Sequence, residues 1–235
     1  AAALFEQLGD AIGQIRTLNK QGIAHALSGE LEAAILTFQT AIDLAKIHGR
    51  LENQVSALNN LGECYQQLFA LEQAINFHQQ ALTLAVETDL RILESDLRRN
   101  LGLDLVLQGS LDAGLPYLQQ ALAISKDTED LDLRLNTLYN LALTELQRNN
   151  IGITRPLIEE LHQRASQHNL RSHLANAYHL QGLLAKKEGD IQSAQELWQQ
   201  ALFLGHETNK RMLLWQIHAE LAEIADNISL AAVHN

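Results

Sequence analysis

The sequence predicts an all-α fold made of repeated helix pairs, and three observations support this prediction. Four series of residues recur with a period of 40 along the 235 residues. Within each period the apolar residues have helical spacing. The chain also holds only two prolines, Pro116 and Pro156, whereas all-β folds rely on turns rich in proline and glycine. The period is the strongest of the three, because self-similarity at a fixed spacing is the signature of a repeat architecture.

The clearest series is an Asn-Leu-Gly string. It stands at 60–62, recurs at 100–102, and returns as Asn-Leu-Ala at 140–142, while Gly22 and Gly182 extend it in both directions. Three further series keep the same period without insertions, which excludes coincidence. They are Ala41, Ala81, Ala121, Leu161 and Ala201; Ala34, Ala74, Gly114, Thr154 and Ala194; and Leu31, Leu71, Leu111, Ile151 and Ile191.

Each period contains two helices. In the second period Leu58, Leu61 and Tyr65 lie on one face of a helix, and the apolar residues of 71–82 define a second one. A short break separates the two, and glycine or asparagine, which tolerate the positive φ that closes a helix, stand there. Each unit is therefore expected to be a helix of about 18 residues, a tight turn and a second helix of similar length. The break residues are Gly29, Gly109, Asn149 and Gly189.

Details of the turns and helix faces follow from residue type. Ser110, Asn150 and Asp190 follow the break and are good N-cap residues. The small residues of the Gly22 series predict that the two helices of a pair approach closely.

In the fourth period we expect the second helix to begin near Pro156 and to be short, because proline is harmless only in a first turn. This irregularity is either a local packing adjustment or a hinge.

The pattern resembles the tetratricopeptide repeat. The Leu-Gly pairs at 61–62 and 101–102, the aromatic Tyr65, and the small Ala74 and Ala81 carry the resemblance, which covers nearly the whole chain. The period is 40 residues where the ordinary repeat has 34, as in the variant found in sensor arms of bacterial regulators and in adaptor proteins. The helix-ending proline of the ordinary repeat is absent. The resemblance implies an α-solenoid of antiparallel helix pairs with a right-handed superhelical twist.

The period also predicts the domain organisation, which is one array over 1–235. Because the chain opens within a second helix and closes after a first helix, we expect an excised segment of a longer chain; the alternative is a small protein with frayed ends. The expected parts are a partial helix at 1–8, repeats at about 9–48, 49–88, 89–128, 129–168 and 169–208, and a last helix with a stub at 209–235.

Candidate binding residues lie on the first helix of each period, on the stripe opposite the packed anchors, which should line a concave inner face. Asparagine recurs there although it is a mediocre helix former, and its amide complements a peptide backbone. Apolar residues on the same stripe indicate an interaction surface. The resemblance implies peptide or helix binding on this face, but the asparagines could instead bond only to neighbouring helices. The predicted site residues are Asn19, Asn59, Asn60, Arg99, Asn100, Leu103, Asn136, Tyr139, Asn140, Leu143, Asn176, His179 and Leu183.

Composition argues against several classes of function. The net charge of −11 disfavours nucleic acid and anionic membranes as partners, and no run of ~18 apolar residues is present to span a bilayer. The single cysteine, Cys64, excludes internal disulfides and Cys-based zinc sites, so we expect a reducing, cytoplasmic compartment. The histidines lack metal-pair spacing, and phosphate-loop and nucleophile motifs are absent. We therefore expect no catalytic residues, no metal and no cofactor.

The sequence favours a non-catalytic scaffold that binds a protein or peptide in the concave groove. The alternative is an effector-sensing arm of a larger signal-transduction ATPase or transcription regulator. Such an arm would hold a small molecule in a compact pocket around Arg99, Tyr139 and His179. A third hypothesis is self-association through the open ends of the array.

Overall fold

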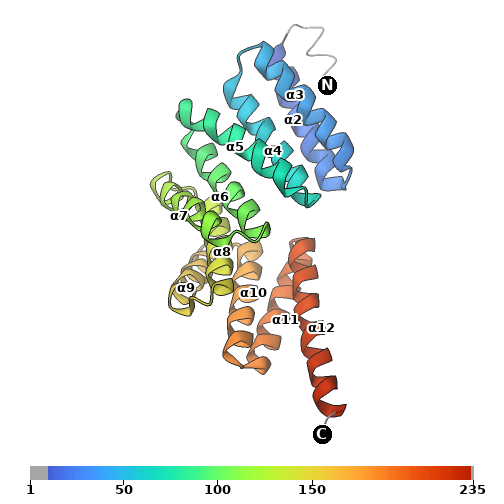
Figure 1. Cartoon of the computed structure of the whole chain (residues 1–235), viewed down its shortest axis with the longest axis vertical. Coiled ribbons are helices and arrows are strands. Elements are labelled where there is room, and N and C mark those ends of the chain that lie inside the picture. The colour runs from blue at the N-terminus through green and yellow to red at the C-terminus, as the bar shows by residue number, and fades with distance from the viewer. Residues whose placement is uncertain (1–9, 234–235) are drawn as a thin grey trace. The chain divides into compact units, whose positions relative to one another are not determined.

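The computed structural model of the chain describes residues 10–233 and the side chains of residues 10–225. The described residues form helices and no strand, which confirms the predicted all-α class (Figure 1). The expected partial helix at 1–8 lies outside them. The helices are α2 (Ala11–Ser28), α3 (Leu31–Ile47), α4 (Leu51–Gln67), α5 (Leu71–Glu87), α6 (Arg91–Leu107), α7 (Leu111–Asp127), α8 (Leu131–Gln147), α9 (Ile151–Gln167), α10 (Arg171–Glu188), α11 (Ile191–Glu207) and α12 (Arg211–Val233).

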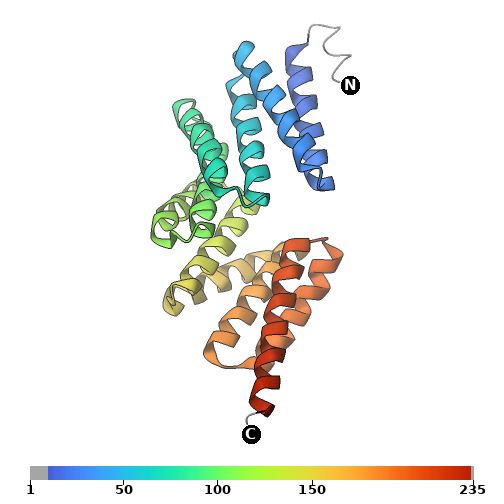
Figure 2. The same cartoon turned by 45° about the vertical axis from the view of Figure 1, so that its right-hand side comes forward.

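The helices form antiparallel pairs whose members lie side by side in both ribbon views (Figures 1 and 2). The first helix of each pair has an even number, and the second has the following odd number. The helices that complete a pair have 17 or 18 residues, as the apolar spacing predicts. The last helix, α12, has 23 residues and continues to Val233, so the positions expected to form a separate stub extend it instead.

The turn inside each pair has the same backbone form. Gly29, Gly109, Asn149 and Gly189 all have positive φ, as predicted. The second turn has Phe69 at this position, with a φ of 55°, although phenylalanine is not a residue type that favours positive φ. Its amide donates to the carbonyl of residue 66, and the next amide donates to residue 65, which is the Schellman pattern.

The predicted N-caps are only partly right. The Asp190 carboxylate accepts a hydrogen bond from the amide of Ser193 at 3.0 Å. The side chains of Ser110 and Asn150 make no capping hydrogen bond. At those helix starts the turn geometry and the burial of the following residues suffice to begin the helix.

The prediction of a short second helix in the fourth pair is wrong. Helix α9 begins at Ile151, so Pro156 is its sixth residue, and Pro116 has the same place in α7. Proline removes one backbone hydrogen bond there. Beginning at Ile151 buries Thr154 and Ile158 completely or nearly so, and full burial of an apolar side chain contributes about 1.5–3 kcal/mol. That burial offsets the missing bond.

Close approach within each pair depends on the small residues, as predicted. A Cβ added to Gly22 would lie 2.5 Å from the Phe38 ring, and one added to Gly182 would lie 2.3 Å from Nε1 of Trp198. The large partners stand sixteen residues after the small ones and are almost completely buried. The repeat therefore places one large side chain over each small residue.

The chain divides into two compact units, residues 1–134 and 135–235, and each is described by itself. The core of unit 1 contains Phe38, Leu61 and Leu101, and that of unit 2 contains Trp198 and Ile217. The single array over 1–235 stays a prediction.

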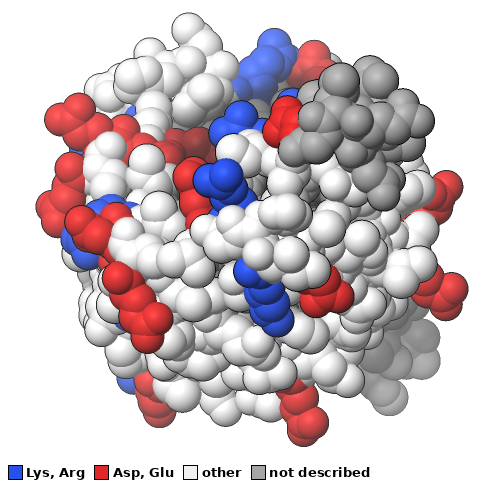
Figure 3. Space-filling view, turned by 90° about the horizontal axis from the view of Figure 1, so that it is seen from above, with Lys and Arg blue, Asp and Glu red and all other residues white. Residues whose placement is uncertain are grey.

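Two surface properties bear on function. Among the described helices, none is both long and apolar enough to cross a membrane. On the face shown in Figure 3, Asp and Glu side chains are spread around the edge, and the few Lys and Arg side chains lie among them. This mixture agrees with the negative net charge of the sequence.

Candidate binding face of the first helices

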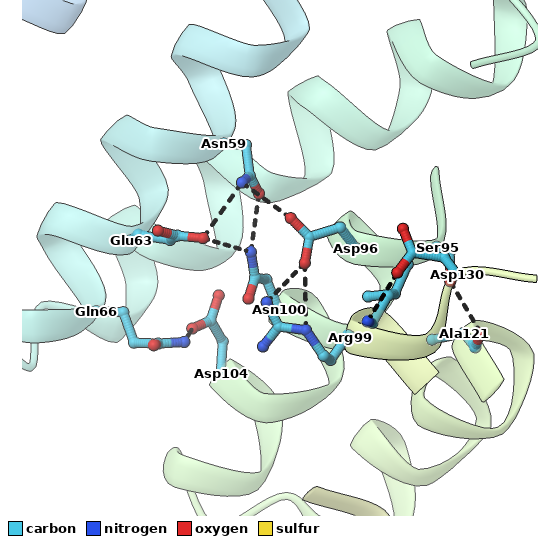
Figure 4. A network of polar contacts seen from close by, with 11 residues as sticks. Asn59, Glu63, Gln66, Ser95, Asp96, Arg99, Asn100, Asp104, Ala121 and Asp130 are labelled. Carbon is cyan, nitrogen blue, oxygen red and sulfur yellow. Dashed lines mark hydrogen bonds and ion pairs between the residues drawn. The ribbon is translucent and has the colours of Figure 1, made fainter. Parts of the chain in front are cut away.

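In unit 1, a network of polar side chains connects α4 and α6 (Figure 4). The amide of Asn100 donates to Oδ1 of Asn59 at 2.9 Å and to Oε1 of Glu63 at 3.1 Å. The amide of Asn59 donates to Glu63 at 3.3 Å and to Oδ2 of Asp96 at 3.4 Å. Arg99 completes the set by donating to Oδ1 of Asp96 at 2.6 Å. We call these five residues the α4–α6 network.

The network holds two carboxylates close together. Partial burial raises the pKa of Glu63 above its ordinary 4.5, and the negative charge of Asp96 raises it further. The positive charge of Arg99 and the hydrogen bond from Asn100 lower the same pKa but do not cancel the rise. Arg99 and the two amides therefore act mainly as internal partners of these carboxylates.

A second set of contacts holds the same helices from behind. Asp104 is completely buried in α6 and accepts a hydrogen bond from Nε2 of Gln66 in α4 at 2.6 Å. Its other oxygen lies 2.5 Å from Nδ1 of the buried His78 in α5. Three consecutive helices are thus connected through one carboxylate, which makes this part of the face rigid.

The remaining predicted residues of unit 1 have fewer contacts. Asn19 in α2 is buried, and its Oδ1 has no hydrogen-bond partner among the described residues. Asn60 is half-buried, and its amide bonds to no described side chain or backbone group. Leu103 is half-buried and lies on the same stripe. These three positions retain hydrogen-bonding capacity or apolar surface that the unit itself leaves unused.

In unit 2, the equivalent stripe carries a neutral cluster. The hydroxyl of Tyr139 in α8 lies 3.0 Å from Nδ1 of His179 in α10 and 3.5 Å from Oε1 of Gln216 in α12. The His179 carbonyl accepts a hydrogen bond from Nε1 of Trp198 at 3.2 Å. Burial lowers the pKa of His179 to about 4 and raises that of Tyr139 above its usual range. Both groups are therefore uncharged at neutral pH. We call Tyr139, His179 and Gln216 the Tyr139–His179 cluster.

The neighbouring cations of unit 2 are already paired. Lys186 donates to Glu220 at 2.7 Å and to Glu223 at 2.8 Å. Partial burial lowers the pKa of Lys186, but the hydrogen bonds and charges of these two carboxylates raise it more. Lys210 donates to Oδ1 of Asn176 at 3.1 Å.

Four predicted residues of unit 2 remain. Asn140 is buried, and its side-chain amide bonds to no residue that the structure describes. Leu143 and Leu183 are half-buried, at the positions equivalent to Leu103 in unit 1. Asn136 is half-buried and makes polar contacts within the chain.

The structure brings only some of the predicted residues into contact. Asn59 joins Asn100 in unit 1, where Arg99 pairs with Asp96, and Tyr139 joins His179 in unit 2. The bonded pair of asparagines differs from the expected row of free amides.

Three residues were missing from the predicted site. Glu63 and Asp96 belong to the α4–α6 network, and Gln216 belongs to the Tyr139–His179 cluster. Gln216 could have been found, because it is the next member of the 40-residue series that contains Asn136 and Asn176.

Comparison of the sequence with family profiles finds a tetratricopeptide repeat at residues 55–88, within helices α4 and α5. No curated protein matches the sequence. The profile match therefore identifies one repeat, and the likeness of the rest of the chain is structural.

Solved structures resemble the chain over most of its length. The apo form of RapI has a TM-score of 0.71 and 12% identity, with 88% of this chain and 89% of RapI covered. The Rap conjugation gene regulator of the plasmid pLS20, in complex with the Phr* peptide, has a TM-score of 0.71 and 13% identity, with 89% and 58% covered. YrrB, a TPR protein with an unusual peptide-binding site, has a TM-score of 0.52 and 20% identity, with 94% and 99% covered. The chain thus has the fold of TPR-like repeat proteins.

Proposed function

We propose that this chain is a non-catalytic scaffold that binds a peptide, or a segment of a partner protein, on the stripe of its first helices. The observation that carries the proposal is a recurring half-buried leucine, present as Leu103, Leu143 and Leu183. In unit 2 it stands one helical turn after Asn140, whose amide bonds to no described residue. Apolar surface next to polar groups with unused hydrogen bonds is suited to an extended peptide.

In such binding, the peptide would supply interactions that the side chains of the stripe do not make within the chain. Asn140 is 8% exposed and its side chain makes no hydrogen bond to a described residue, and a peptide backbone can offer its amide both a donor and an acceptor. The leucines would contribute by excluding water from these hydrogen bonds. Asn59 and Asn100 would then serve the site indirectly, because their own amides hold α4 and α6 together.

The comparisons support the class of ligand. One structural neighbour was solved with a bound Phr* peptide, and another has a peptide-binding site. Because sequence identity to both is low, they support peptide binding in general and leave the peptide sequence open.

Peptides selected from a displayed random library on the intact chain would test the proposal. A selected peptide should lose at least about tenfold in affinity for the variant Leu143→Asp/Leu183→Asp, because a charge would replace the apolar anchors. Fluorescence anisotropy with the labelled peptide gives the dissociation constants. A second variant, Asn140→Ala, should weaken binding while leaving the apolar surface intact.

The control is Phe203→Asp, which places the same charge on an apolar side chain exposed on the second helix α11. It should bind the selected peptide like the unchanged chain. Equal binding by all variants, or loss only in the Phe203 variant, would show that the first-helix stripe is not the site.

The Tyr139–His179 cluster favours a second candidate function, the binding of a small neutral effector. Its three side chains offer a hydroxyl, an uncharged imidazole and an amide, and the hydroxyl lies within hydrogen-bonding distance of the other two. This role would suit a sensing arm of a larger regulator. A thermal-shift screen with small metabolites tests it, and a shift that disappears in Tyr139→Phe and His179→Gln would favour the effector over the peptide.

A further inference from the structure

The turns inside the helix pairs of unit 1 expose large apolar side chains. Leu27 is the next-to-last residue of α2 and is 79% exposed, and Leu107 is the last residue of α6 and is 46% exposed. Between them, Leu68 and Phe69 form the turn after α4 and are 48% and 70% exposed. Helix α4 contacts both α2 and α6 within unit 1, and the three helices run in the same direction as first members of antiparallel pairs, so their C-terminal turns lie at the same end of the pairs. We call these four residues the tip row.

Phe69 has an unfavourable backbone conformation. Its φ is 55°, in the left-handed region, where a residue with a Cβ costs about 1–2 kcal/mol more than in the right-handed region. The other four turns of this kind have glycine or asparagine, which adopt this conformation more easily. The ring of Phe69 is mostly exposed, so the core does not require it. An aromatic side chain kept in water at a strained position indicates a contact outside the unit.

The charge around the tip row has one sign. The segments 24–33, 64–73 and 104–113, which form the three turns and their flanks, contain no lysine or arginine. Each second helix begins with an exposed carboxylate at its second residue, namely Glu32, Glu72 and Asp112. Apolar side chains therefore lie beside a row of acids.

The two turns of this kind in unit 2 differ in both respects. Their flanks include Arg148 and Lys187, so they carry positive charge. Among the described residues of unit 2, Ile153 is an exposed large apolar side chain near one of these turns, but the positions equivalent to the tip row hold no leucine or phenylalanine. The tip row is therefore a property of unit 1 and not a consequence of the repeat.

We propose that the tip row of unit 1 is a docking surface for a cationic amphipathic segment of a partner protein. Apolar side chains of the segment would pack against Phe69, Leu68 and Leu107. Its lysines or arginines would lie near Glu32 and Glu72. A second copy of this chain is a poor occupant, because two acidic rows would face each other. This surface is distinct from the stripe of the first helices.

The test uses the intact chain and a labelled, synthetic Leu/Lys amphipathic helix, followed by fluorescence anisotropy. The variant Phe69→Gly should lose about tenfold in affinity while its melting temperature stays equal or rises, because glycine relieves the backbone strain. Phe69→Asn should do the same, with the residue type that the fourth turn has. The control Ile47→Asn removes an exposed apolar side chain from the opposite end of a helix pair in unit 1 and should bind normally.

A second comparison separates the specific charge row from general attraction to an acidic protein. Glu32→Gln/Glu72→Gln should weaken binding of the Leu/Lys helix more than Glu52→Gln/Glu87→Gln, which removes the same charge at the opposite end of the pairs. A Leu/Glu helix of equal length should not bind. The groove variant Leu143→Asp/Leu183→Asp should bind the Leu/Lys helix like the unchanged chain, so the two proposals can fail separately.

Three results would overturn the proposal. They are equal binding of the Leu/Lys helix by Phe69→Gly and the unchanged chain, equal losses in the two glutamine pairs, and a melting temperature lowered by both Phe69 variants. The last would show that the ring stabilises the fold. A fourth contrary result would come from sedimentation velocity. If the unchanged chain self-associates and Phe69→Gly does not, the surface binds a second copy of this chain.

Discussion

Two positions of the repeat that hold a charged side chain in one pair of unit 1 hold only neutral side chains in unit 2. Glu63 in the second pair corresponds to Leu143 and Leu183, and Arg99 corresponds to Tyr139 and His179. In unit 1 Glu63 accepts a hydrogen bond from Asn100 across α4 and α6, and Arg99 pairs with Asp96 within α6. In unit 2 they form an uncharged surface beside an unbonded amide. One backbone position can therefore serve as an internal link or as open surface, and its side chain decides which.

The largest expected effect concerns packing in unit 2. Gly182→Ala would place a Cβ 2.3 Å from Nε1 of the buried Trp198, whose ring cannot move without losing its hydrogen bond to His179. We expect a loss of about 3 kcal/mol in the free energy of unfolding, measured by urea denaturation. Its counterpart in unit 1, Gly102→Ala, should cost less, because the nearest atoms are farther away, Cγ of Leu118 at 2.8 Å and the carbonyl oxygen of Gly114 at 3.0 Å.

The matched control is Gly152→Ala, in a helix of the same unit. A Cβ there meets no atom within 4 Å, and alanine favours a helix by about 1 kcal/mol over glycine. This variant should be equally stable or more stable. A Gly182 variant as stable as the unchanged chain would mean that the pair α10 and α11 is less tightly packed than described.

The next expected effect is on the pH dependence of the free energy of unfolding, which should have opposite signs for His179 in unit 2 and Glu63 in unit 1. The pKa of His179 is lowered from 6.5 to about 4 in the folded chain. Between these values the unfolded imidazole binds a proton that the folded one does not, so stability falls as the pH falls, by up to ~3 kcal/mol. His179→Gln should remove this dependence in urea denaturation measured at several pH values.

Glu63 provides the contrast. Its pKa is raised above 4.5, so the folded carboxyl binds a proton at a pH where the unfolded one has lost it. Its contribution to stability therefore grows as the pH falls through the raised pKa toward 4.5. Glu63→Gln should remove that gain and stabilise the chain slightly at neutral pH. Slopes of the same sign for the two residues would contradict the assignment of burial as the main cause at both.

The smallest expected effect separates Asn100 from Asn140, which have the same place in successive repeats. Asn100→Ala should lower the free energy of unfolding by about 1–2 kcal/mol, because Asn59 and Glu63 lose a donor. Asn140→Ala removes no hydrogen bond to a described residue and gains helix propensity, so its stability should be unchanged or higher. Urea denaturation of both variants is sufficient, and equal losses would remove the distinction between the two units at this position.

Sequence patterns predicted the helices well because the signals that define them are local. The 40-residue period and the positions of Gly29, Gly109, Asn149 and Gly189 follow from apolar spacing and from backbone preferences of single residues. The same rules failed at Phe69, where an unsuitable residue adopts the turn, and at Pro156, where burial outweighs a missing hydrogen bond.

The candidate site was less predictable for a different physical reason. Residue type and helix face were sufficient to select the stripe of the first helices, including Asn59, Asn100 and Tyr139. Which side-chain amides are hydrogen-bonded and which stay unbonded depends on partners 37 to 41 residues away, brought close by packing between first helices. Such contacts leave no local pattern, because any helix face can meet several neighbours. The sequence period alone was therefore enough to locate the stripe of the first helices. The packing of the helix pairs determines which of its side chains bond to neighbouring helices and which stay available at the surface.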